Sequence, residues 1–149
     1  MAAGPNEVKV NVIGVFEQPV GPAEQEQPQP LVVVRDEAGR RELHVPVGSC
    51  EGVAIQIALT QEVAPRPLTH DLAVRLLERL SAELERVVID ALGDHTYYAR
   101  LHLKSVEGEV TIEARPGDAV ALAVRAEAPI YVVEDVLVRD GRPGGEASA

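Results

Sequence analysis

Hydrophobic and polar positions alternate over several stretches of the chain, which is the period of half-buried β-strands. Residues from Glu7 to Val15 alternate valine with polar side chains, and residues 43–47 alternate again after the continuous apolar run Leu31–Val34. Between the alternating stretch at residues 7–15 and the apolar run at residues 31–34, residues 18–30 contain four prolines together with glutamine and glutamate. The pattern predicts a strand, a surface loop at residues 18–30 and a hairpin.

A second group of strands is expected in the other half of the chain. Residues 96–104 and 110–115 alternate on either side of a turn at residues 107–109, which predicts a second hairpin. Short apolar runs at residues 87–89 and 130–133 predict two further buried strands.

Helical spacing of apolar residues appears in three segments. The first begins at Gly48-Ser49, ends near Gln61 and carries apolar side chains at positions 53, 54, 57 and 58 of one face. The second begins at Thr69 and carries leucines at positions 72, 76, 77, 80 and 84, which we expect to face the core. The third runs from Asp118 to about Ala126.

The first and third helices belong to two segments with one plan, in which a hairpin and a short polar junction precede an acidic residue and a helix. Residues 51–58 can be aligned with residues 118–125, both rich in alanine and β-branched side chains. We interpret this as a duplicated ββα unit. It predicts a single compact α+β domain over residues 1–138, with helices packed on a mixed or antiparallel sheet, and a disordered tail at residues 139–149.

Composition narrows the partners that this domain can have. The 149 residues fit one domain, and neither a signal-peptide pattern nor a membrane-spanning apolar run is present, so we expect a cytoplasmic protein without membrane contact. The single cysteine, Cys50, excludes an intramolecular disulfide. The formal net charge of −10 argues against a broad surface for nucleic acid, so any contact with DNA or RNA is expected to be local.

Polar chemistry is concentrated where the second helix begins. Pro67 disfavours helical geometry at Arg66, Thr69 is a good N-cap, and Asp71 falls in the first turn. These features are ordinary for a helix start. They also fit a site, because an arginine and free N–H groups bind anions and His70-Asp71 supplies an acid/base or metal-ligand pair.

The third helix begins in a similar way, with Arg115-Pro116 followed by Asp118. If the fold brings the two helix starts together, one cleft holds two arginines, His70 and two aspartates. Such a cleft would bind a phosphodiester through the arginines and a divalent cation through the carboxylates. The alternative is that Arg115 and Asp118 form only a salt-bridged junction.

Four motifs in order along the chain resemble the bifunctional nuclease domain family of bacteria and plants. They are RPLTHDL at residues 66–72, YYA at 97–99, EARPGDAVALA at 113–123 and APIYV at 128–132, and the similarity extends from about Glu7 to Leu137. The resemblance implies a compact α+β domain and the DNase and RNase activity reported for some members. The family pattern falls on residues Arg66, Thr69, His70, Asp71, Arg115 and Asp118. The chain departs from it at Gly117, where serine is usual, and at Gly52, where alanine is usual.

Motifs and resemblance together lead to the hypothesis of a metal-assisted phosphodiesterase that acts on DNA or RNA. In it, Asp71 and Asp118 hold Mg²⁺ or Mn²⁺, and His70 is the general base or orients the attacking water. The substrate is bound by Arg66, Thr69 and Arg115. Two alternatives remain open, a regulatory module that binds a small anionic ligand and an oligomeric scaffold. A homo-oligomer is expected in each case.

Overall fold

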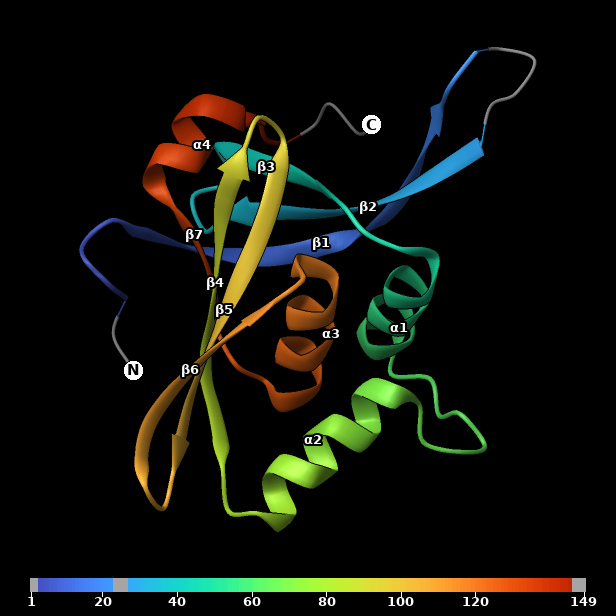
Figure 1. The fold of residues 1–149 in the computed structure, drawn as a ribbon. Coiled ribbons are helices and arrows are strands. Elements are labelled where there is room, and N and C mark those ends of the chain that lie inside the picture. The colour runs from blue at the N-terminus through green and yellow to red at the C-terminus, as the bar shows by residue number, and fades with distance from the viewer. Residues whose placement is uncertain (1–2, 23–26, 146–149) are drawn as a thin grey trace.

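The chain folds around one mixed eight-stranded sheet, seen in the computed structural model, which describes residues 3–22 and 27–145. The strand order is β6-β5-β4-β7-β1-β2-β3-β8. Helices α1, α2 and α3 lie together on one side of the sheet, and α4 lies near its β3 end (Figure 1). The strands are β1 (Glu7–Val20), β2 (Gln27–Asp36), β3 (Arg41–Pro46), β4 (Glu83–Gly93), β5 (Thr96–Ser105), β6 (Gly108–Ala114), β7 (Ile130–Val133) and β8 (Arg142–Pro143). The helices are α1 (Ser49–Thr60), α2 (Thr69–Arg79), α3 (Pro116–Ala126) and α4 (Glu134–Asp140).

The predicted duplication is visible in the topology. Strands β1, β2 and β3 form an antiparallel meander that leads into α1, and β4, β5 and β6 form another that leads into α3. Strand β7 lies between the two meanders, antiparallel to β1 and parallel to β4. Because α1 and α3 also contact each other, the two ββα units share one core. The predicted α+β class and single compact domain are confirmed.

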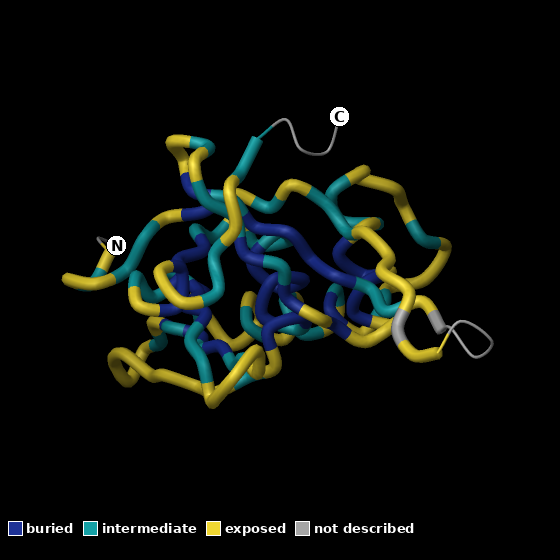
Figure 2. The backbone as a smooth tube through the Cα atoms, turned by 90° about the horizontal axis from the view of Figure 1, so that it is seen from above, coloured by how far each residue is buried: buried dark blue, intermediate teal, exposed yellow. Residues whose placement is uncertain are grey.

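The core lies between the sheet and the paired helices α1 and α3, in the centre of the molecule (Figure 2). The central strands are buried continuously at residues 31–34 of β2 and 87–89 of β4, and Val32, Val34 and Ile89 belong to the core on the helical side. Helix α3 is buried along residues 119–123, where small side chains let it lie close to its neighbours. The closest approach is at Gly117, since a Cβ atom there would lie 2.8 Å from the Cβ atom of Glu51 in α1.

The proline-rich segment is less loop-like than predicted. Strand β1 continues to Val20 and β2 begins at Gln27, so most of residues 18–30 lie in a paired β-ribbon. Proline loses only its donor, and its carbonyl still accepts, as Pro30 does from the Val47 N–H at 3.0 Å. The predicted strand at residues 87–89 is likewise the centre of the longer β4.

The predicted core face of α2 is confirmed at Leu77 but wrong at Leu72, Leu76 and Leu80. Leu72, Leu76 and Leu80 are 52%, 54% and 71% exposed, and position 84 lies in β4 instead of the helix. The side chains that pack on the core are those at 73, 74 and 77. The reason is that residues 70 and 71 are bonded to α3, and these contacts fix the rotation of α2 about its axis. In α1, Ile55 is buried and Val53 is exposed, so the predicted face is again rotated.

Ordered structure continues beyond the predicted boundary at residue 138. Helix α4 ends at Asp140, and Arg142 and Pro143 then pair with β3 as β8. The rest of the predicted tail, residues 146–149, lies outside the described residues. In the described part of the chain, no helix combines the length and apolar character that crossing a membrane requires.

Candidate functional site

The first turns of α1, α2 and α3 meet at one place on the helical side of the sheet. The third residue of each helix is an acid: Glu51 in α1, Asp71 in α2 and Asp118 in α3. Negative side chains are favoured there by the helix dipole and by the free N–H groups of the first turn. The duplication therefore places Glu51 and Asp118 at equivalent positions, and α2 adds a third helix start beside them.

A histidine–aspartate pair links α2 to α3. His70 Nε2 lies 2.8 Å from Asp118 Oδ1, and His70 is buried, with 9% of its surface exposed. Partial burial raises the pKa of Asp118, but hydrogen bonds from His70 and Arg115 outweigh this effect and hold the pKa below its usual value. Asp118 is thus a carboxylate, which only accepts hydrogen bonds. Nε2 of His70 is therefore the donor in this contact, and in the tautomer that makes it the other ring nitrogen, Nδ1, is the acceptor.

Arg115 binds the other oxygen of the Asp118 carboxylate. Its Nε and Nη2 atoms lie 2.8 and 2.7 Å from Asp118 Oδ2, and its Nη1 lies 3.6 Å from Glu51 Oε1. The hydrogen bond to Asp118 is the largest cause of the raised pKa of Arg115. The side chain is 72% exposed, so a cation fixed by two carboxylates faces solvent. Hereafter the site comprising His70, Asp118, Arg115 and Glu51 is called the dyad site.

Glu51 is the member of the dyad site that the sequence analysis did not name. Its carboxylate lies over the helix start, where a Cβ atom on residue 48 would be 2.6 Å from Glu51 Oε2, so a side chain at residue 48 would displace this carboxylate. The signal that points to Glu51 is its alignment with Asp118 in the repeat. Its position indicates a role in holding Arg115.

A pocket of about 370 Å³ lies beside the dyad site, between α1 and α2. Cys50, Thr69 and His70 are among the side chains that line it. Thr69 was predicted as the N-cap of α2, but Leu68 occupies that position and Thr69 is the first helical residue. The capping bond is made instead by Asp71, whose Oδ2 accepts the Leu68 N–H at 2.8 Å.

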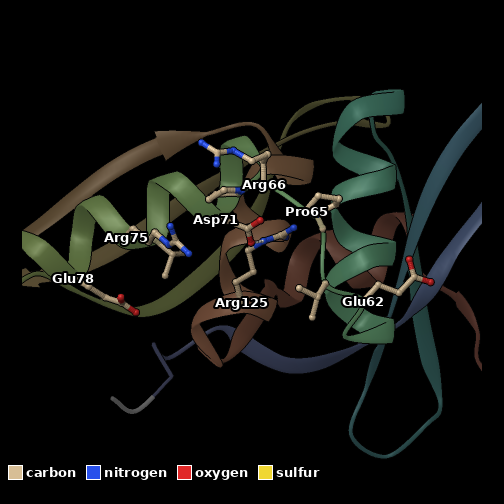
Figure 3. Close-up of a pocket in the computed structure, with 11 residues that line it drawn as sticks. Glu62, Pro65, Arg66, Asp71, Arg75, Glu78 and Arg125 are labelled. Carbon is tan, nitrogen blue, oxygen red and sulfur yellow. Dashed lines mark hydrogen bonds and ion pairs between the residues drawn. The ribbon is translucent and has the colours of Figure 1, made fainter.

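Asp71 and Arg66 lie on the other side of the α2 start. Asp71 Oδ1 accepts a hydrogen bond from Arg125 Nε at 2.7 Å, and the bonds from Arg125 and Leu68 lower the pKa of Asp71. Arg66 lines the same pocket as Asp71 and Arg125, which is separate from the pocket beside His70 (Figure 3). The structure thus brings His70, Asp118 and Arg115 together, whereas the neighbouring Asp71 turns away from them.

The geometry does not fit a metal site held jointly by Asp71 and Asp118. Each carboxylate is bonded to a different arginine, Asp71 to Arg125 and Asp118 to Arg115. Within residues 3–22 and 27–145, no group of three or more His, Cys, Asp and Glu side chains is arranged to hold a metal ion.

Comparison with known proteins places this geometry in a family context. The model of the bifunctional nuclease domain family matches residues 32–143, which include every residue of the dyad site. The chain belongs to the bifunctional nuclease domain family. The resemblance inferred from the four sequence motifs is confirmed.

The relatives fall into two groups. An uncharacterised protein of Mycobacterium tuberculosis is 38% identical over 133 residues, which cover 89% of this chain and 76% of the relative. A protein of Oryza sativa subsp. japonica named bifunctional nuclease 2 is 29% identical over 119 residues. A protein of Arabidopsis thaliana named bifunctional nuclease 1 is 28% identical over the same length. The matches to these two plant proteins cover 76% of this chain and 36% of each relative, so the similarity concerns one part of the plant chains.

Proposed function

We propose that this protein is a nuclease that hydrolyses phosphodiester bonds of DNA or RNA at the dyad site. The observation that carries the proposal is the 2.8 Å contact between His70 and Asp118, next to an exposed arginine and a pocket. A carboxylate that orients a histidine is a common arrangement for general base catalysis. Membership of the bifunctional nuclease domain family supports the same reaction class.

Each side chain has a defined task in the proposed reaction. Asp118 accepts a hydrogen bond from the Nε2–H of His70. This leaves His70 Nδ1 to take a proton from the attacking water. The water oxygen bonds to phosphorus, the bond from phosphorus to the leaving sugar oxygen breaks, and solvent protonates that oxygen. Arg115 stabilises the charge that develops on the non-bridging oxygens. Glu51 holds Arg115 in place and does not contact the substrate.

Dependence on Mg²⁺ or Mn²⁺ stays a prediction, as does the choice between DNA and RNA. Both follow from one assay, which is cleavage of labelled single-stranded DNA and RNA with each cation or with EDTA. Cleavage that is lost in EDTA would support the predicted dependence on a divalent cation, and cleavage that persists in EDTA would contradict it.

The assay that tests the proposal compares His70→Gln and Asp118→Asn with a matched control. His44→Gln removes a similar pair, since His44 Nε2 lies 2.8 Å from Glu42 Oε1. His44 alternates with the core residues Leu43 and Val45 of β3, so it belongs to the strand face that points away from the core. We expect the first two variants to lose roughly 10²–10⁴-fold in kcat, the usual contribution of a general base, and His44→Gln to keep wild-type activity. Wild-type cleavage by a folded Asp118→Asn protein would overturn the assignment.

A binding module for a small anionic ligand is the second candidate. The net charge of −10 favours it, because polymeric nucleic acid is repelled by an acidic surface. Thermal stabilisation by nucleotides without turnover would support this function over hydrolysis. The expected homo-oligomer also stays a prediction, which sedimentation analysis of the wild-type protein tests.

A further inference from the structure

We propose that the pocket on the far side of the α2 start binds the backbone phosphates of a single-stranded nucleic acid next to the scissile bond. This inference rests on the proposed function. The pocket has a volume of about 490 Å³, and its lining includes Arg66, Pro67, Asp71, Arg75 and Arg125. We call it the arginine pocket.

The base of the arginine pocket is a fixed ion pair. Arg125 is almost fully buried, and besides its bond to Asp71 it donates to the Ala121 carbonyl at 3.0 Å. Asp71 is held from its other oxygen by the Leu68 N–H. Because Asp71 and Arg125 neutralise each other, the charge that a ligand meets is set by the remaining side chains.

Two of those side chains are arginines that form no hydrogen bond or ion pair in the described part of the chain. They are Arg66 and Arg75, and both are exposed. Elsewhere in the molecule arginines are commonly paired, as Arg35 is with Glu42. Two guanidinium groups without ion pairs that line one pocket of an acidic protein favour an anionic ligand, and their planar forks match phosphate oxygens.

Acidic residues of the arginine pocket limit the density of negative charge that the ligand can carry. Glu62 and Glu78 also line the arginine pocket. In Figure 3 their carboxylates point away from the centre, whereas the Arg75 guanidinium points towards the Asp71–Arg125 pair. A single strand carries half the phosphate density of a duplex along its axis, so it brings fewer charges against these carboxylates. The pocket is therefore suited to one strand.

The two pockets are joined by a very short piece of chain. Leu68, Thr69 and His70 line the pocket beside the dyad site, and Arg66, Pro67 and Asp71 line the arginine pocket. A strand with one phosphodiester at Arg115 and His70 can cross the first turn of α2 and place a neighbouring phosphate between Arg66 and Arg75.

A binding assay with the His70→Gln protein tests the proposal without cleavage. Fluorescence polarisation measures its affinity for labelled single-stranded DNA and RNA over a range of salt concentrations. Adding Arg75→Gln or Arg66→Gln should weaken binding and flatten the plot of log K against log salt by about 0.7 for each lost phosphate contact. Arg79→Gln is the matched control, because Arg79 lies one turn further along α2, carries the same charge and does not line the pocket. Equal losses in Arg75→Gln and Arg79→Gln, or no loss in Arg75→Gln, would overturn the proposal.

Cleavage assays separate this inference from the proposed function. With wild-type His70, Arg75→Gln should lower kcat/KM for an oligonucleotide but leave hydrolysis of bis-nitrophenyl phosphate, which has no neighbouring phosphate, unchanged. If the wild-type protein cleaves neither substrate but binding still depends on Arg75, the nuclease function fails and the arginine pocket stands. If Arg75→Gln cleaves both substrates like the wild type, the arginine pocket fails and the nuclease function stands.

Discussion

A side chain at residue 117 has no room, and Gly117→Ala should therefore destabilise the protein. An added Cβ atom would lie 2.8 Å from the Glu51 Cβ and 3.1 Å from the Val47 Cβ. Carbon atoms normally pack at about 3.5–4.0 Å, so α1 and α3 would have to separate by several tenths of an ångström or more. The position is otherwise ordinary helix, since its φ is not in the left-handed region.

Two opposing terms set the size of the effect. Overpacking in a core costs about 1–3 kcal/mol, while alanine in place of glycine within a helix gains about 1 kcal/mol. The expected net loss is about 1 kcal/mol, which corresponds to roughly 3 °C in Tm for a chain of this size. The larger variant Gly117→Val should lose more, because its methyl groups enter the same contact.

Denaturant unfolding followed by circular dichroism measures this change. Gly93→Ala is the control, because a Cβ atom at Gly93 would meet nothing within 4 Å. We expect that control to stay within about 0.5 kcal/mol of the wild type. If Gly117→Ala and Gly117→Val are both as stable as the wild type, α1 and α3 do not approach at Gly117 as described.

Two further predictions concern single contacts. Glu51→Gln removes one of the two carboxylates that hold Arg115. It should lower kcat/KM by about tenfold, in the range of a single charge contact, while the unfolding free energy changes little. An unchanged kcat/KM would contradict the role of Glu51. Arg139 and Tyr97 donate hydrogen bonds that lower the pKa of Asp140 from 3.8 to about 2. The stability that this carboxylate contributes is present above pH 3.8 and is lost as the pH falls towards about 2. Tyr97→Phe removes one of the hydrogen bonds and should therefore raise the pH at which acid unfolding begins. Acid unfolding of the variant at the same pH as the wild type would contradict the prediction.

Local patterns were enough to predict the hairpins, the helix starts and the duplication. Each depends on residues close in sequence, such as the turn at 107–109 or the Arg115-Pro116 junction that begins α3. The fold class followed because the same pattern occurs twice. Sequence periodicity also placed His70 and Asp118 at helix starts, although only the fold shows that they meet.

The incorrect predictions arose from contacts between distant residues. Leucines at helical spacing suggested a core-facing stripe on α2, but the bonds from His70 to Asp118 and from Asp71 to Arg125 decide which face turns inward. Asp71 and Arg125 are 54 positions apart, so no local pattern shows that they pair. The same contact explains why Asp71 does not join Asp118.

The position of β7 makes the two halves of the molecule depend on each other. This strand comes from the end of the chain, yet it forms the seam of the sheet by bonding to β1 on one side and β4 on the other. Glu51 belongs to the first half and Asp118 to the second, and Arg115 reaches both across that seam. Both repeats contribute to the candidate site, so a chain that ends before β7 would lack the strand that joins the two halves of the sheet.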